Sequence, residues 1–224
     1  MRVMKLPRHT DAFVFDFDGT LARLNIDFPA MRHRIPDLLT SYGVDPDGLG
    51  DLFVLEMIEA GSRLLDDGTS QRAAEFTERA LAIIYEIEID GAHAGNLFDG
   101  IDAMLQALRD RDKKIGVVTR NCLDAVKILF PAIESFTDII VTRESTTRPK
   151  PHPEHLERAL TGLHAEPARA VMIGDHPMDI VVGKDVGTLT IGVLTGHSDE
   201  ALMRDAGADY IIKQATDIVG LIEE

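Results

Sequence analysis

The sequence AFVFDFDGTL occupies residues 12–21. Its first half is a short apolar run rich in strand-forming residues, and Asp-Gly-Thr then ends the run with turn chemistry. The run is nearly continuous in apolar character, as expected of a strand whose two faces are both covered by helices. The stretch therefore predicts a buried β-strand that ends in two aspartates, Asp16 and Asp18.

Further apolar runs of the same character lie in the second half of the chain. They are residues 115–119, 138–142, 170–174, 189–194 and the shorter 210–212. Helical patterns separate several of them, over residues 100–113, 122–135 and 153–163. Alternating strands and helices indicate a parallel sheet with right-handed crossovers. The expected fold class is therefore α/β, with a Rossmann-like parallel sheet core and helices on both faces.

Residues 23–96 interrupt this pattern. They contain no convincing strand, and their sequence predicts helices over roughly 28–41, 48–66 and 69–90, with breaks near residues 43–50 and 66–68. Because the interruption follows the first strand, we expect a helical cap domain, residues 23–96, inserted into an α/β core made of residues 1–22 and 97–224. One continuous α+β domain is the alternative.

Charge and composition limit the classes of partner. The 224 residues carry a formal net charge of −15, whereas nucleic acids and anionic membranes bind basic surfaces, so we expect neither as a partner. The single cysteine, Cys122, allows no disulfide within the chain. No apolar run has the length of a membrane span or of a secretory signal. These features favour a cytoplasmic protein, and both a monomer and a homodimer remain open.

The aspartates that end the first strand indicate a metal site. Side chains two apart on a strand point to the same side, and ligands bind at the carboxyl ends of parallel strands. Asp16 and Asp18 would repel each other unless a cation neutralised them, and Mg²⁺ prefers such oxygen ligands. Asp175 follows the run 170–174 in the same way and is the third expected ligand. The alternative is a surface turn with solvated aspartates.

Four segments, in this order, resemble the motifs of the haloacid dehalogenase-like hydrolase superfamily. They are Asp16-Phe17-Asp18-Gly19-Thr20-Leu21, the strand end Val117-Val118-Thr119, the pair Lys150-Pro151, and Gly174-Asp175 followed by Asp179. The helical insertion after the first motif is similar to that of the subgroup containing phosphoglycolate phosphatases and β-phosphoglucomutases. The resemblance implies a Mg²⁺-dependent phosphatase that acts on a small phosphorylated metabolite.

The resemblance also implies catalytic roles for Asp16, Asp18, Thr119 and Lys150. Asp16 would be the nucleophile that accepts the phosphoryl group, and Asp18 would be the general acid and then the general base. The hydroxyl of Thr119 would hold phosphoryl oxygens. Lys150 would neutralise Asp16 and the charge of the transferring group.

Supporting roles are expected for residues beside these motifs. Backbone N–H groups near Arg120 and Asn121 would help to bind the phosphoryl group, and the Arg120 side chain could contact substrate. Asp179 would support the metal site, through a water or by bonding Lys150, or would only cap a helix. His176 receives no role. His152 and His155 are expected as solvated residues at a helix start rather than as metal ligands.

Other activities remain open alongside hydrolysis. A phosphomutase would use the same intermediate, although mutase-like relatives often have Val where Thr20 stands. A dehalogenase needs no metal and lacks the second aspartate, so Asp18 argues against it. A protein that binds phosphate ligands without catalysis is a different class. The candidate substrates include phosphoglycolate, sugar phosphates, nucleotide monophosphates and pyrophosphate.

Overall fold

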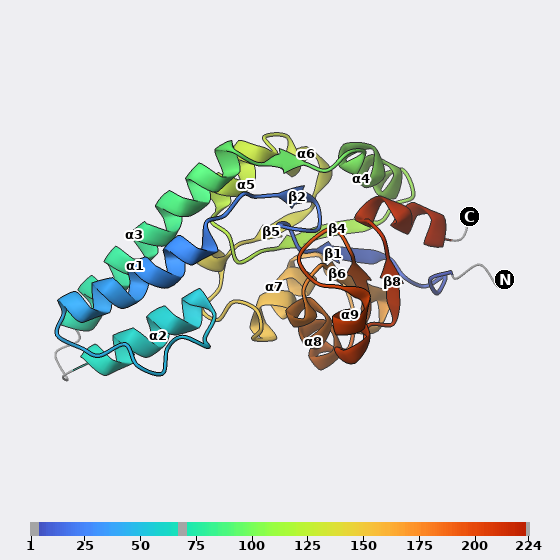
Figure 1. The fold of residues 1–224 in the computed structure, drawn as a ribbon. Coiled ribbons are helices and arrows are strands. Elements are labelled where there is room, and N and C mark those ends of the chain that lie inside the picture. The colour runs from blue at the N-terminus through green and yellow to red at the C-terminus, as the bar shows by residue number, and fades with distance from the viewer. Residues whose placement is uncertain (1–4, 67–70, 223–224) are drawn as a thin grey trace. The chain divides into compact units, whose positions relative to one another are not determined.

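The computed structural model describes residues 5–66 and 71–222, and these residues form two compact units (Figure 1). One unit is Met1–Leu24 with Gly95–Glu224, and the other is Asn25–Ala94. The sequence predicts the junctions between the units at 22/23 and 96/97. In the structure they lie at 24/25 and 94/95, because the short strands β2 (Ala22–Arg23) and β3 (Asn96–Leu97) pair with each other. The prediction that residues 23–96 contain no strand is therefore wrong at both ends, where two-residue strands are too short to leave a periodic pattern.

The first unit is built on a six-stranded sheet with the order β5-β4-β1-β6-β7-β8. The strands are β1 (Ala12–Phe15), β4 (Lys114–Val118), β5 (Ile139–Val141), β6 (Ala170–Gly174), β7 (Leu189–Val193) and β8 (Tyr210–Ile212). Each neighbouring pair runs parallel, which confirms the α/β prediction. β1 lies between β4 and β6, and Phe15 is in register with Val117 and Ile173. The carboxyl ends of these three strands therefore meet at one edge of the sheet.

Helices cover both faces of this sheet (Figure 1). They are α4 (Ile101–Arg109), α5 (Leu123–Leu129), α6 (Ile133–Phe136), α7 (Glu154–Gly162), α8 (Pro177–Val186) and α9 (Glu200–Asp205), with short 3-10 helices at Arg143–Ser145, Pro167–Arg169 and Ala215–Leu221. Val14 of β1 packs in one buried cluster with Leu156 of α7 and Val182 of α8. The alternation of apolar strands with amphipathic helices thus produces a layered core.

The single helix predicted over residues 122–135 is two helices in the structure. α5 ends at Leu129, and Phe130 has left the helical region with φ −130° and ψ 76°. Pro131 follows, and a proline both lacks an N–H group and disfavours helical geometry in the residue before it. The prediction of one continuous helix is therefore wrong, and Pro131 is the physical reason.

In the described part of the second unit, three helices share a core of their own. They are α1 (Phe28–Ser41), α2 (Val54–Leu65) and α3 (Gln71–His93), and buried side chains such as Ile35, Met57 and Phe76 form one cluster. α2 begins six residues later than the predicted 48–66, because Gly48 has a φ of +84° and the chain turns there. The predicted helix start at 69–70 and part of the break at 66–68 lie outside the described residues.

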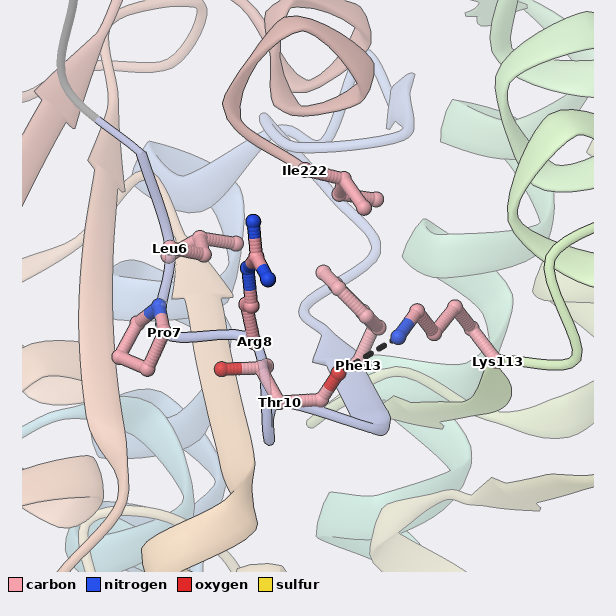
Figure 2. A pocket seen from close by; sticks show the side chains of 7 residues that line it. All are labelled: Leu6, Pro7, Arg8, Thr10, Phe13, Lys113 and Ile222. Atoms are coloured by element: carbon pink, nitrogen blue, oxygen red, sulfur yellow. Dashed lines mark hydrogen bonds between the residues drawn. The ribbon is translucent and has the colours of Figure 1, made fainter. Parts of the chain in front are cut away.

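A cavity of about 220 Å³ opens where β1 and β4 begin (Figure 2). It is lined by Leu6, Pro7, Arg8, Thr10, Phe13, Lys113 and Ile222, and Lys113 Nζ donates to the Thr10 carbonyl at 2.8 Å. The residues predicted to carry the chemistry follow the other ends of these strands. In the described part of the chain, no helix combines the length and apolar character that a membrane crossing requires.

Candidate active site

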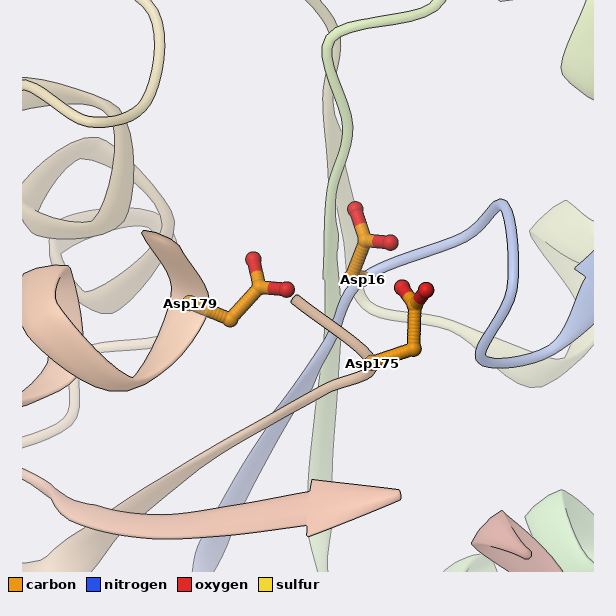
Figure 3. A group of neighbouring side chains, drawn as sticks. All are labelled: Asp16, Asp175 and Asp179. Carbon is orange, nitrogen blue, oxygen red and sulfur yellow. The ribbon is translucent and has the colours of Figure 1, made fainter. Parts of the chain in front are cut away.

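Three buried carboxylates meet at the carboxyl edge of the sheet (Figure 3). Asp16 follows β1, Asp175 follows β6, and Asp179 lies in the first turn of α8. Each offers an oxygen, and these oxygens lie within 4.8 Å of one another. β1 and β6 are adjacent and parallel, so the residues that follow them leave the sheet side by side. α8 then returns the chain so that Asp179 faces the same point (Figure 3).

Lys150 lies against two of these carboxylates. Its Nζ donates to Asp16 Oδ1 at 2.6 Å and to Asp179 Oδ1 at 2.6 Å. Only 2% of the lysine is exposed. Burial by itself favours the neutral amine, but the charges of Asp16 and Asp179 raise the pKa of Lys150 above its ordinary value. The ammonium therefore stays charged and bridges the two carboxylates. Its bond to Asp179 is one of the alternatives that the sequence offers for that residue.

The same crowding shifts the pKa values of the carboxylates. Burial raises the pKa of Asp16 to about 6, although the Lys150 charge opposes the rise. Burial, followed by the charge of Asp16, raises the pKa of Asp175 to about 8. Within residues 5–66 and 71–222, Asp175 forms no salt bridge with a cationic side chain. Asp175 is therefore the carboxyl group of the cluster that is least compensated by a cation.

Glycines form the wall around these carboxylates. A Cβ atom at Gly19 or Gly196 would collide with the carboxylate of Asp175, and one at Gly174 would collide with that of Asp179. Gly19 also has a φ of +82°, which side chains rarely tolerate. The backbone thus approaches the carboxylates closely, and a side chain at any of these three positions would force a carboxylate to move.

The side chain of Asp18 points to the chain that follows it. Its Oδ1 accepts a hydrogen bond from the Leu24 backbone N–H at 2.7 Å. The cluster of three carboxylates consists of Asp16, Asp175 and Asp179, whereas the sequence indicated Asp16, Asp18 and Asp175 as the metal ligands. Asp18 still raises the pKa of Asp175, so its charge acts on the cluster. The spacing of Asp179, in the first turn of a helix after a strand-ending Asp, is the sequence signal that places it there.

Thr119 and Asn121 form a turn at the end of β4. The Thr119 side chain is fully buried, and its hydroxyl donates to Asn121 Oδ1 at 2.9 Å and accepts from the Asn121 N–H at 3.1 Å. α5 begins just beyond, with Cys122 at its N-cap. Because β4 and β1 are adjacent, this turn lies at the same sheet edge as Asp16. Phosphoryl binding by Thr119 and Asn121 stays a prediction.

The Arg120 side chain contacts the loop that carries Lys150. Its guanidinium donates to the Lys150 carbonyl at 2.5 Å and to Met178 Sδ at 3.5 Å. Arg143 donates in turn to the Arg120 carbonyl at 3.4 Å. These bonds hold the lysine loop beside α8, and contact between Arg120 and substrate stays a prediction.

His176, to which the sequence assigns no role, caps α8. Its Nδ1 accepts from the Met178 N–H at 3.1 Å, and its own N–H donates to Asp179 Oδ2 at 3.2 Å. Burial lowers its pKa, which keeps the ring neutral and able to accept. The reciprocal pair is a capping arrangement that also orients the Asp179 carboxylate.

The solvent exposure of His155 differs from the predicted one. The sequence predicts a solvated residue at a helix start, but the side chain is fully buried. It lies in the first turn of α7 and faces the core together with Leu156 and Ala159. The prediction is wrong because the helical spacing of His155 and Ala159 places both on the covered face, a signal that the sequence contains.

Comparison with known proteins identifies the family. A model of the haloacid dehalogenase-like hydrolases matches residues 13–193, which is more than half of the chain. The chain belongs to the haloacid dehalogenase-like hydrolase family. The resemblance seen in the four sequence motifs is thereby confirmed. All four motifs lie inside the matched residues.

Curated haloacid dehalogenase-like relatives are named pyrophosphatases. Pyrophosphatase PpaX of Bacillus pumilus is 34% identical over 120 residues, which span 53% of this chain and 56% of that protein. The match to this relative thus spans little more than half of its length. Pyrophosphatase PpaX of Bacillus cereus strain Q1 is 28% identical over 216 residues, which span 94% of this chain and 95% of that protein.

Several solved structures share the fold of this chain. A hydrolase from Pseudomonas syringae has a TM-score of 0.64 at 21% identity and covers 94% of this chain and 96% of its own. A β-phosphoglucomutase from Clostridium difficile has a TM-score of 0.63 at 17% identity, with 93% and 92% covered. At these identities the likeness concerns the fold alone.

The residues of the cluster fit the Mg²⁺ ion that the family implies. Carboxylate oxygens are the hard ligands that Mg²⁺ prefers, and the three side chains already lie within reach of one centre. Lys150 neutralises part of their charge, and Asp175 has no cationic partner among the described residues. A divalent cation bound there would supply the missing positive charge. Asp16, Asp175 and Asp179 are the side chains that could hold it.

Proposed function

We propose that this chain is a Mg²⁺-dependent phosphatase that hydrolyses a small phosphate ester through a phosphoryl group on Asp16. One observation supports this proposal above the others. Asp16 is buried, is bonded to Lys150 Nζ at 2.6 Å, and shares its site with Asp175 and Asp179. A carboxylate placed beside an ammonium and a metal-binding cluster is suited to attack a phosphoryl group. The Lys150 ammonium and a bound Mg²⁺ would neutralise the charge of that group.

In the first step, an oxygen of Asp16 attacks the phosphorus of the substrate. The new O–P bond forms as the bond between phosphorus and the leaving oxygen breaks. Asp18 gives its proton to that oxygen, so the product leaves as an alcohol from an ester, or as a protonated phosphate from pyrophosphate. Lys150, bonded to Asp16 Oδ1, stabilises the charge on the transferring oxygens. Mg²⁺, held by Asp16, Asp175 and Asp179, would add further neutralisation of the phosphoryl charge.

In the second step, water releases the phosphoryl group. Asp18, now a carboxylate, takes a proton from a water molecule as that water attacks the phosphorus. The bond between phosphorus and Asp16 breaks, inorganic phosphate leaves, and Asp16 regains its carboxylate. The Leu24 N–H bond to Asp18 Oδ1 fixes the side chain through both proton transfers. Residues 25–94 form the compact unit that we propose as the cap domain.

Pyrophosphate is the first substrate to test, because the named relatives are pyrophosphatases. Phosphoglycolate, sugar phosphates, nucleotide monophosphates and a generic aryl phosphate complete the panel. A phosphomutase would return the phosphoryl group to a sugar and release little inorganic phosphate. A protein that only binds phosphate ligands would release none.

The experiment measures release of inorganic phosphate with Mg²⁺ and with a chelator. We expect turnover that requires the metal and falls by on the order of 10³-fold or more in Asp16→Asn, with circular dichroism unchanged. Asp11→Asn is the matched control, since Asp11 lies before the opposite end of β1 and pairs with Arg169. Undiminished turnover in the chelator, or near wild-type turnover in Asp16→Asn, would contradict the proposal.

A further inference from the structure

The buried imidazole of His155 connects two segments of the site. Its Nδ1 lies 3.0 Å from the backbone N of Lys150, and its Nε2 lies 3.1 Å from the carbonyl oxygen of Val141. The side chain has no solvent-exposed surface. Neither the proposed reaction nor the helix-start interpretation of the sequence gives this side chain a task.

These two contacts settle where the ring proton is. A backbone N–H can only donate, so Nδ1 accepts from Lys150 and carries no proton. A carbonyl can only accept, so Nε2 carries the proton and donates to Val141. Burial, followed by the Lys150 charge, lowers the pKa of His155 to about 3, so that this neutral form is kept throughout the physiological range.

The Val141 carbonyl has a second donor. It also accepts from the Thr119 N–H at 3.0 Å, and its two lone pairs can serve both bonds. Val141 ends β5, which pairs with β4. One carbonyl therefore joins the Thr119 turn to the His155 ring, and the ring joins both to the Lys150 loop.

The Lys150 backbone depends on its hydrogen bond to His155 Nδ1 more than the backbone of an ordinary loop residue would. Pro149 and Pro151 flank it, and proline nitrogens carry no hydrogen, so the Lys150 N–H is the only backbone donor in residues 149–151. That donor goes to His155, while the Lys150 carbonyl accepts from Arg120 at 2.5 Å. Both polar groups of the Lys150 backbone are thus held by side chains.

We propose that His155 is a positioning residue, whose neutral imidazole fixes the Lys150 backbone to the end of β5 so that the lysine ammonium bridges Asp16 and Asp179. It is not a catalytic residue, because it touches neither the carboxylates nor the phosphoryl site. Its effect on turnover rests on the proposed phosphatase function. Its effect on the geometry of Lys150 does not, and the two can be measured separately.

The first measurement concerns the bonds themselves and needs no substrate. Nitrogen-15 NMR of the full chain should show His155 with its proton on Nε2. Hydrogen exchange of the Lys150 amide should be slow in the wild type and at least about tenfold faster in His155→Leu, which keeps an apolar side chain but loses both ring bonds. His152→Leu is the control in the same turn, since His152 bonds the Glu154 N–H instead. A proton on Nδ1, or unchanged Lys150 exchange in His155→Leu, would overturn the inference.

The second measurement separates positioning from packing. We expect His155→Leu to lower kcat by up to about 10²-fold with a smaller change in KM, because a displacement of the order of 1 Å suffices for such a loss. His155→Gln should regain much of kcat, since its amide can both accept and donate. Assays are run well below the Tm of each variant, so that unfolding does not contribute. A wild-type kcat in His155→Leu, or a glutamine variant no better than leucine, would overturn the inference.

The two measurements also keep this inference distinct from the proposed function. If the wild type hydrolyses no phosphate ester, the phosphatase proposal fails, and the NMR result alone decides whether His155 fixes Lys150. If the wild type hydrolyses a phosphate ester and hydrogen exchange of the Lys150 amide does not depend on His155, the phosphatase proposal stands and the positioning proposal fails.

Discussion

At the scale of single residues, the site gathers buried acidic side chains whose charge is only partly neutralised. Asp16, Asp175 and Asp179 are all buried, and Lys150 is the cation that the structure places among them. Lys150 bonds Asp16 and Asp179. Burial, followed by the charge of Asp16, raises the pKa of Asp175 to about 8. A carboxyl group that holds its proton near neutral pH is a poor metal ligand until a cation displaces that proton. Metal binding and proton release are therefore coupled here.

This coupling predicts how stability depends on pH. The folded pKa of Asp175 is about 8, well above its ordinary value of 3.8, so between these values the folded chain holds a proton that the unfolded chain has lost. The metal-free protein therefore loses stability as the pH rises through that window. Mg²⁺ should restore it, and its stabilising effect should be larger near about pH 8 than near about pH 5.5.

Thermal melts in chelator and in Mg²⁺ measure this effect. At a concentration 100-fold above Kd, a ligand adds about 2.7 kcal/mol, which corresponds to a rise in Tm of roughly 5–10 °C for a protein of this size. Asp175→Asn should abolish most of the Mg²⁺ effect and flatten its pH dependence. Equal stabilisation at both pH values, or an undiminished effect in the variant, would contradict the coupling.

At the scale of elements, the glycines next to the strand ends shape the site. Gly196 lies in the loop after β7, and its Cα faces the Asp175 carboxylate so closely that a Cβ would collide with it. Gly220 lies in the short 3-10 helix at Ala215–Leu221, and a Cβ atom there would meet no neighbouring atom within 4 Å. The two glycines are therefore a matched pair for substitution.

We predict that Gly196→Ala displaces Asp175 and lowers turnover by about tenfold or more, together with the Mg²⁺-dependent rise in Tm. Gly220→Ala should leave both properties near wild type, because its added methyl group meets no atom within 4 Å. Kinetics and thermal melts on the two variants provide the comparison. Similar behaviour of both would show that the close approach at Gly196 does not matter.

The elements also show how far the sequence could predict this site. The strand ends that carry Asp16, Thr119 and Asp175 could be located because buried parallel strands are continuous apolar runs. The position of Lys150 could be expected only from its motif, since no periodic pattern fixes the path of a loop. The ring contacts of His155 depend on that path and could not be predicted. The break at Pro131, by contrast, follows from a rule that applies to the sequence alone.

At the scale of the whole molecule, two units each have a separate apolar core. The cluster around Phe76 consists of residues of the second unit, and the cluster around Val14 consists of residues of the first. Phe76 is fully buried, and Tyr42 packs edge-on against it with ring centroids 5.9 Å apart. Each unit can therefore be destabilised through its own core.

We predict that Phe76→Ala speeds amide exchange throughout residues 25–94 far more than in the strands of the first unit. Removal of a buried phenylalanine costs about 3–5 kcal/mol, and the loss should be local to the core that contained it. Phe28→Ala is the matched control in the same unit, since Phe28 is 43% exposed. Equal acceleration in β1 and β4 would show that the two units unfold together.

We propose that Asp16 carries the phosphoryl group during turnover, and this can be tested directly. Reduction with borohydride during steady-state hydrolysis converts an aspartyl-phosphate to homoserine, and mass spectrometry of the peptide that contains residue 16 detects the change. We expect homoserine at position 16 only when substrate and Mg²⁺ are both present, and none in the Asp16→Asn variant. Rapid turnover with an unmodified residue 16, or with the modification at another carboxylate, would contradict it.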